Sequence, residues 1–291
     1  MYILTDYINY DNINIIFEHS VIILSIIYRG LIMSLSFLKL IALISMTIDH
    51  ITRILPAQTI LMNLFGMGRP ESAALLRAVQ PLGRVAYPLF AFCVAQGCLH
   101  TSNKKRYLLR LLFFAILSEI PFQLAFYAGN FHPAVNNVIF TMLIGALACM
   151  SYSYFCRKNK KTVACILAIS FAVLAEILGT DYGAFGVIII LIPYIVESKK
   201  YKLLLLFIAL TIFYMGYASL GDPSYIFLWL NPNNNSFLNL YTLNWLASLL
   251  SLVCIGLYNN SRGIRLKWLF YLYYPLHLLL LFFLRRSIYP S

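Results

Sequence analysis

An acidic residue and a histidine stand next to each other inside an apolar segment of the chain. Asp49 and His50 close the run from Phe37 to His50. A charged side chain at the centre of a bilayer costs roughly 2.5–3.5 kcal/mol on insertion scales, so ionisable residues in spans commonly mark functional sites. Histidine is the usual general base, and a neighbouring carboxylate can orient it. The pair predicts acid–base chemistry, with a buried ion pair between helices as the alternative.

Adjacent residues on a helix point about 100° apart, so Asp49 and His50 need not contact each other. Each can have a partner on another helix, and Arg84 is the first candidate. It follows Gly83, which permits close approach, and it precedes Pro88, which frees backbone carbonyls. Its planar guanidinium suits a carboxylate or a phosphate. The partner of Arg84 is therefore either Asp49 or an anionic group of a substrate.

Two further ionisable residues stand beside prolines in apolar runs. Glu119 precedes Pro121, and His277 follows Pro275. Glu119 is a second acid or base, the counter-ion of Arg84, or an ordinary residue at the membrane interface. His277 either joins the acid–base chemistry or bonds to a neighbouring backbone carbonyl. We predict a catalytic role for both residues, beside that of the Asp-His pair.

Three polar residues complete a predicted substrate-binding set with Arg84. Asp181 stands in an Asp-Tyr-Gly turn, where an aspartate is commonly structural. Asn137 and Thr141 open an apolar segment. An amide at this place could stabilise an oxyanion, and helix capping is the alternative.

A cluster of basic and polar residues follows the second apolar segment. It predicts a binding site for the phosphates of a cytosolic donor, although membrane topology alone would also put cations here. The members of the cluster are His100, Thr101, Lys104, Lys105, Arg106 and Arg110.

The elements that must position these residues are membrane helices. Of the 291 residues, 61% are hydrophobic and 11% are charged, and the mean hydropathy is +0.80, whereas soluble domains carry about 25% charged residues. The apolar runs are continuous, which predicts an all-α polytopic membrane protein. The net charge of +12 does not indicate nucleic-acid binding, because the cations stand between the apolar runs. The six cysteines form no CxxC pair and predict neither a disulfide framework nor a metal site.

We predict nine transmembrane helices around a polar intramembrane cavity. Residues 1–36 form an N-terminal extension that is interfacial or flexible, and residues 37–291 form the membrane domain. The expected spans are residues 37–55, 76–99, 107–127, 134–155, 162–179, 184–197, 202–220, 239–258 and 267–284.

The short connections predict the orientation in the membrane. Lysines and arginines gather on alternate connections, which the positive-inside rule places in the cytoplasm. The N-terminus is then cytoplasmic and the C-terminus is outside, with Arg285 and Arg286 as exceptions. Two outer connections, residues 56–77 and 221–238, are long enough to form a lid or a partner-binding surface.

In their order and spacing, several motifs together resemble the TraX family of bacterial inner-membrane proteins, which is named for the acetylase of conjugative F-type pilin. The resemblance covers most of residues 37–285. The residues that carry it include Lys39, Met46-Thr47-Ile48-Asp49-His50, Gly83-Arg84-Val85-Ala86-Tyr87-Pro88, Tyr107, Arg110, Ser118-Glu119-Ile120-Pro121, Asn137, Thr141, Asp181-Tyr182-Gly183 and Tyr274-Pro275-Leu276-His277.

The resemblance implies an integral membrane acyltransferase that uses acetyl-CoA, without a metal, to acetylate a pilin-like protein or peptide amine. By position, its site residues are Asp49, His50, Arg84, Glu119, Asp181 and His277. Family likeness does not choose the acceptor, so O-acetylation of an envelope glycan or lipid stays open. A proton-coupled transporter and a non-catalytic partner in pilus or envelope assembly are the rival functions.

A mechanism follows as a hypothesis. The phosphates of acetyl-CoA bind near Lys104, Lys105 and Arg106. His50, assisted by Asp49, takes a proton from the acceptor, and Arg84 or Asn137 stabilises the oxyanion. Direct transfer and a relay through an acylated histidine both fit the residues.

Overall fold

The computed structural model describes residues 33–127, 132, 134–216, 240–264 and 267–288. Residues 1–32 of the predicted N-terminal extension and the whole Asn-rich connection at residues 221–238 lie outside these residues. The described part of the chain is helical, and its β structure is limited to two isolated bridges, Met33 to Tyr258 and Asn136 to Thr180.

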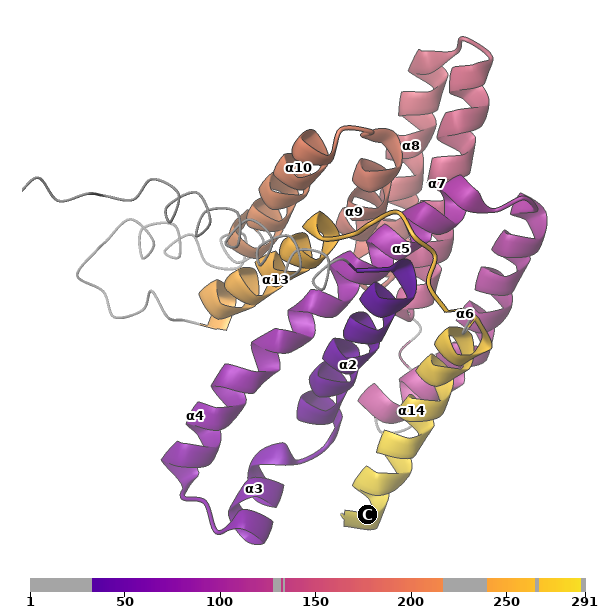
Figure 1. Ribbon diagram of the computed structural model, residues 1–291. Coiled ribbons are helices and arrows are strands. Elements are labelled where there is room, and N and C mark those ends of the chain that lie inside the picture. The colour runs from indigo at the N-terminus through magenta and orange to yellow at the C-terminus, as the bar shows by residue number, and fades with distance from the viewer. Residues whose placement is uncertain (1–32, 128–131, 133, 217–239, 265–266, 289–291) are drawn as a thin grey trace, which may run out of the picture.

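Figure 1 shows the described helices. Their bounds are α2 Leu35–Ile54, α3 Ala57–Phe65, α4 Arg69–Val79, the 3₁₀ helix η1 Gln80–Val85, α5 Ala86–His100, α6 Lys104–Tyr127, α7 Val138–Arg157, α8 Lys161–Ile177, α9 Gly183–Ile195, α10 Lys199–Thr211, the π-helix η2 Ile212–Gly216, α13 Leu240–Gly256 and α14 Lys267–Ile288.

Each predicted span overlaps one of these helices, so their positions along the chain were predicted correctly. Five helical segments in the described part of the chain are long and apolar enough to cross a membrane, which makes the chain a helical membrane protein. The count of nine crossings is not confirmed, because the other helices are shorter. The five segments are Leu35–Ile54, Arg69–His100, Lys104–Tyr127, Val138–Arg157 and Trp268–Ile288.

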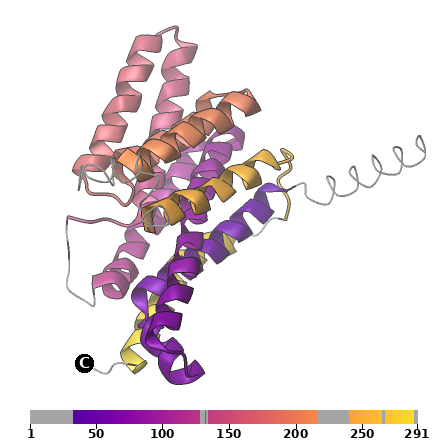
Figure 2. The same ribbon diagram turned by 90° about the vertical axis from the view of Figure 1, so that its left-hand side faces the viewer.

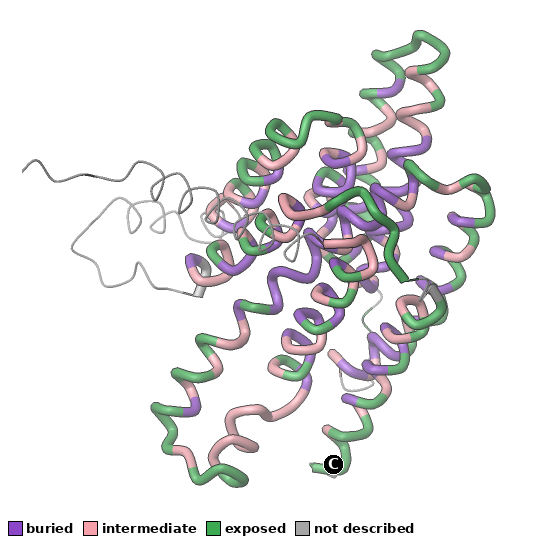
Figure 3. Tube along the Cα trace, viewed as in Figure 1, coloured by how far each residue is buried: buried purple, intermediate pink, exposed green. Residues whose placement is uncertain are grey.

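The burial pattern is that of a bundle surrounded by lipid. Large apolar side chains face outward on α6 and α8, as Phe113, Ile120 and Ile169 do. Charged and polar side chains such as Asp49 and Arg84 are buried inside the bundle. Figure 3 shows the buried residues gathered along the helix faces that point inward. Ionisable residues in membrane helices face the bundle interior in this way.

The connections that carry the predicted cytoplasmic cations lie at one end of the bundle, which we call the basic end. They are the connections α5–α6, α7–α8, α9–α10 and α13–α14, in the upper half of Figure 1. At the opposite end, α3 and α4 form a helical hairpin that turns at Gly66, whose φ is 64°. Figures 1 and 2 both show this hairpin at the end of the molecule where α14 finishes. The segment at residues 56–77, predicted as a long connection, is therefore mostly helical.

Two local structures position the polar residues at the opposite end. α4 continues through η1 into α5, and η1 packs against α2, which brings Arg84 next to α2. A short backbone pairing holds the turn between α8 and α9 against the start of α7. In it, the Asn136 N–H donates to Gly179 O at 2.9 Å, and the Asp181 N–H donates to Asn136 O at 2.9 Å.

Candidate active site

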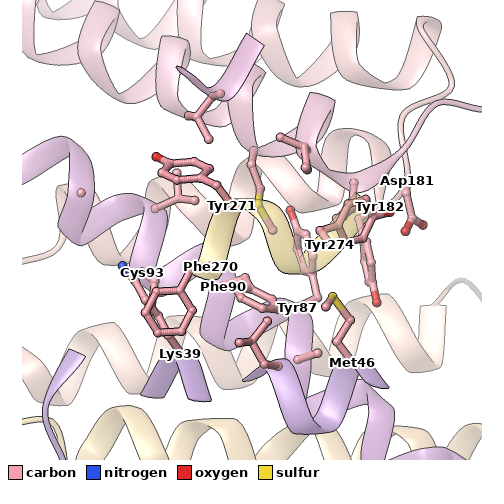
Figure 4. A pocket seen from close by; sticks show the side chains of 18 of the residues that line it. Lys39, Met46, Tyr87, Phe90, Cys93, Asp181, Tyr182, Phe270, Tyr271 and Tyr274 are labelled. Atoms are coloured by element: carbon pink, nitrogen blue, oxygen red, sulfur yellow. The ribbon is translucent and has the colours of Figure 1, made fainter. Parts of the chain in front are cut away.

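A cavity of about 780 Å³ lies inside the bundle. Its walls come from α2, η1, α5, α6, α7, η2 and α14, together with the α8–α9 turn and the α13–α14 connection. Lys39 near the start of α2 and Asp49 both line it, and ten residues of helix span about 15 Å. Figure 4 shows Lys39 on one side of the cavity and Asp181 on the other. The cavity therefore extends from the basic end toward the opposite end.

Two histidines from distant parts of the chain meet beside this cavity. His50 Nδ1 lies 2.7 Å from His277 Nε2, and the two rings are nearly parallel, at 7°. His277 Nδ1 lies 2.7 Å from the backbone carbonyl oxygen of Tyr273. Both histidines are buried. The sequence left two alternatives for His277. Its bond to a backbone carbonyl is present, and its contact with His50 is compatible with a role in acid–base chemistry.

These contacts determine the tautomers of the two neutral rings. A carbonyl oxygen can only accept, so the proton of neutral His277 must be on Nδ1, which donates to Tyr273 O. His277 Nε2 is then an acceptor, and His50 Nδ1 must donate to it. The remaining nitrogen, His50 Nε2, keeps its lone pair. No hydrogen bond to this atom is seen within the described part of the chain.

His50 borders the cavity, whereas His277 stands behind it and does not. The His50 ring is held edge-on by Phe126, at 5.2 Å between ring centroids, and by Tyr274 at 6.1 Å. The Tyr273 hydroxyl lies 2.6 Å from that of Thr47, which joins α14 to α2 one turn from the histidines. His50 can therefore reach a substrate in the cavity, and His277 can act only through His50.

Asp49 has different partners from its neighbour in the sequence. It accepts a hydrogen bond from Arg84 and forms an ion pair with Arg53, whose Nε lies 3.2 Å from Asp49 Oδ1. The Asp49 and Arg84 side chains are 12% and 11% exposed, whereas that of Arg53 is 43% exposed. Of the two predicted partners of Arg84, the carboxylate is the one present. The expectation that Asp49 assists His50 is corrected, because His277 takes that place.

Arg84 still has capacity for a substrate. Its Nε is buried and has no hydrogen-bond partner among the described residues, and Arg84 lines the cavity. The Tyr87 hydroxyl is also buried without a partner there, and it too borders the cavity. Unpaired buried donors are uncommon in native structures, so these two groups mark a place for a polar ligand atom.

Gly83 allows the close approach that brings Arg84 to Asp49. A Cβ at position 83 would lie 2.5 Å from Asp49 Cβ and 3.0 Å from its Cα, so the backbone of α2 would have to move.

We expect Gly83→Ala to lower the melting temperature, as an overpacked core typically loses about 1–3 kcal/mol of stability. Gly256→Ala, where the nearest atom would be at 3.7 Å, is the matched control. Equal melting temperatures for the two variants, measured in the same detergent, would contradict this contact.

Asp181 and Thr141 meet at the far side of the cavity. The Thr141 hydroxyl donates to the backbone carbonyl of Asp181 and so fixes the α8–α9 turn. The Asp181 side chain is exposed and borders the cavity. Asp181 thus lines the cavity, and its role in substrate binding stays a prediction, whereas Thr141 supports the turn.

Glu119 and Asn137 form a structural unit outside the cavity lining. Asn137 Oδ1 accepts from the Ile139 N–H at 3.0 Å and caps α7. Its Nδ2 donates to Glu119 Oε2 at 2.6 Å and to Ala115 O at 2.8 Å. Every polar group of the Asn137 side chain is used, so the predicted oxyanion role is corrected to helix capping. Glu119 accepts from Asn137 and from Gln123, and in these contacts it is not the counter-ion of Arg84.

The predicted donor-binding cluster is divided between two places. His100, Thr101 and Arg110 line the cavity, whereas Lys104 and Lys105 line a separate groove on the outside of the bundle. Arg106 lines neither the cavity nor that groove and is exposed. These six residues therefore do not form one site.

Two cations at the basic end of the cavity were absent from the predicted set. Lys39 lines the cavity and lies over the Phe270 ring, with Nζ 5.1 Å from the ring centroid. Arg262 lines it from the connection between α13 and α14. With Arg110 they give this end of the cavity three cationic side chains. Among the described residues, no group of three or more metal-ligating side chains is found.

Comparison with known proteins agrees with this architecture. Residues 34–285 match the family model of the TraX protein. The chain is also 30% identical over 263 residues to a protein of Dichelobacter nodosus named "Probable fimbrial assembly protein FimC, serogroup H1", in an alignment that covers 84% of this chain and 92% of that protein. No solved structure matches the chain. The family match includes both histidines and the Asp49–Arg84 ion pair, and the chain belongs to the TraX family.

Proposed function

We propose that this membrane protein is an acyltransferase of pilus biogenesis, which moves an acetyl group from acetyl-CoA to an amine of a protein or peptide acceptor. The observation that carries the proposal is the chain of contacts from Tyr273 O through His277 to His50 at the wall of a large cavity. A histidine whose tautomer is fixed by a second group is the arrangement used by general bases in acyl transfer.

In the proposed step, His50 Nε2 accepts a proton from the acceptor nitrogen as that nitrogen attacks the thioester carbonyl. The carbonyl oxygen gains negative charge, and in this proposal the guanidinium of Arg84, a residue that lines the cavity, stabilises it. Collapse of the tetrahedral intermediate breaks the carbon–sulfur bond, and His50 returns the proton to the departing thiolate. The products are the N-acetyl amide and coenzyme A. A relay in which His50 Nε2 is itself acetylated uses the same atoms in two steps.

The two ends of the cavity support opposite entry of the two substrates. Lys39, Arg110 and Arg262 at the basic end suit the phosphates of acetyl-CoA. At the other end, the Asp181 carboxyl suits a positively charged amine before it loses its proton. With the positive-inside rule, the basic end and the N-terminus face the cytoplasm, the C-terminus faces outside, and the membrane is the bacterial inner membrane.

The family and its relative guide the choice of acceptor. The relative's printed name describes a fimbrial assembly protein. A pilus subunit or another envelope protein is therefore the proposed acceptor, and O-acetylation of an envelope glycan or lipid is an alternative outcome. The labelling experiment described next distinguishes a protein acceptor from a glycan or lipid acceptor.

The experiment uses the full chain in lipid nanodiscs with radiolabelled acetyl-CoA and an extract of bacterial envelopes. We expect label in a protein band, resistant to hydroxylamine, because amides resist this nucleophile and esters do not. Label that hydroxylamine removes would show O-acetylation instead. Empty nanodiscs are the control. Absence of transfer above that control with several extracts would overturn the enzyme proposal, and proton-linked uptake would then be measured.

A further inference from the structure

A second hollow lies on the outside of the bundle, between α6 and α7 at the basic end. It is a groove of about 550 Å³ and shares no lining residue with the cavity. We call it the α6–α7 groove. Its lining residues are Lys104, Lys105, Leu108, Leu109, Leu147, Met150, Ser151, Tyr154, Phe155 and Arg157.

The charged and apolar residues of the groove are separated along the helix axes. Lys104 and Lys105 are in the first turn of α6, and Arg157 is the last residue of α7. The apolar side chains lie farther from the basic end along the helix axes. The farthest, Leu147, is ten residues, or about 15 Å, before Arg157 on α7. No carboxylate lines the groove. It thus combines a cationic rim with an apolar floor.

Membrane topology alone explains cations at this end of the bundle, but it does not require a recess beneath them. Ser151 and Tyr154, which carry hydroxyls, also line the groove. Tyr154 is 47% exposed, and Lys158 Nζ lies 4.5 Å from the centroid of its ring. The hydroxyls and the nearby fourth cation give a phosphate further partners at the level of the membrane surface.

We propose that the α6–α7 groove binds an anionic phospholipid of the surrounding membrane. The phosphate lies among Lys104, Lys105 and Arg157, and one acyl chain follows the apolar floor toward Leu147. A phospholipid has the same order of charge and hydrocarbon along its length as the groove has along α6 and α7. Basic pockets between membrane helices bind anionic headgroups in this manner. Lys104 and Lys105 then serve a lipid and not the acyl donor.

The test is native mass spectrometry of the full chain, released from nanodiscs that contain graded fractions of phosphatidylglycerol in phosphatidylcholine. We expect one phosphatidylglycerol to stay bound. The variant Lys104→Gln/Lys105→Gln/Arg157→Gln should weaken its retention at least about tenfold, since it removes the three cations that line the groove. The control Lys199→Gln/Lys200→Gln/Lys202→Gln removes the same charge from the start of α10, at the same end of the bundle.

Two further measurements distinguish a lipid seated in the groove from anions attracted to the basic end in general. Ser151→Trp fills the groove without changing its charge and should also release the lipid, because the acyl chain loses its place. Soluble coenzyme A should not compete with the lipid. An equal loss in the α10 control would show general attraction to the surface, and full retention in Ser151→Trp or displacement by coenzyme A would likewise overturn the proposal.

Discussion

Replacement of His50 by alanine is expected to abolish acetyl transfer, whereas replacement of His277 by leucine should lower kcat by about 10²–10⁴-fold. His50 borders the cavity, and its Nε2 keeps a lone pair that could accept a proton. His277 does not border the cavity, so its contribution is to hold the His50 ring in one orientation and one tautomer. Loss of His277 therefore affects the chemical step and leaves the KM for acetyl-CoA nearly unchanged.

The variant His277→Gln distinguishes this positioning role from a purely structural one. A glutamine amide can donate to Tyr273 O and accept from His50 Nδ1 at the same time, as His277 does. We expect its kcat to lie between those of the wild type and His277→Leu. Size-exclusion profiles and melting temperatures of all three variants serve as the folding control. Full activity in His50→Ala would contradict the role of His50 as general base. Equal kcat in the two His277 variants would contradict the positioning of His50 by His277.

The helices could be predicted from the sequence because apolar length is a local property. The same reasoning failed at the α3–α4 hairpin, where Gly66, Gly68 and Pro70 suggested a loop. Gly66 ends α3, and Pro70 stands in the first turn of α4, where its missing N–H breaks no helical bond. These residues therefore mark the ends of two short helices and do not prevent them.

Some of the polar residues at the cavity could also be predicted, but their pairing could not. His50 and His277 are 227 residues apart, and nothing local to either residue says that they meet. Helix geometry predicted only that Asp49 and His50 could have separate partners. In the structure they do, since Asp49 pairs with Arg84 and His50 contacts His277. The two further cations of the cavity, Lys39 and Arg262, were missed because a cation near the end of an apolar segment is what any membrane protein has there.

Adjacency in the sequence was misleading at the start of α6. Lys104, Lys105 and Arg106 form one run, and a shared phosphate site was the natural interpretation. On a helix, however, successive residues point about 100° apart. Lys104 and Lys105 turn toward α7, whereas Arg110, from the next turns of α6, reaches the cavity. Adjacency in this run therefore did not show which of the cations share a site with Arg110.

Removal of the Asp49 carboxylate is expected to destabilise the protein more than removal of the Arg84 guanidinium, although the two form one ion pair. Asp49→Asn leaves Arg84 buried and without a charged partner. Breaking a buried pair in this way typically costs about 3–5 kcal/mol. Arg84→Met leaves Asp49 with Arg53, whose side chain is 43% exposed and can adjust. The predicted order of melting temperatures is therefore wild type, Arg84→Met, then Asp49→Asn.

The double variant Asp49→Asn/Arg84→Met decides whether the buried charge causes this order. It contains no uncompensated charge at these positions, so its melting temperature should exceed that of Asp49→Asn. Additive losses would show instead that both side chains act through packing alone. Activity should not recover with stability, because the double variant lacks the guanidinium of Arg84, a residue that lines the cavity. A stable and inactive double variant would separate the two contributions of Arg84, the ion pair that holds η1 against α2 and the donor that an oxyanion requires.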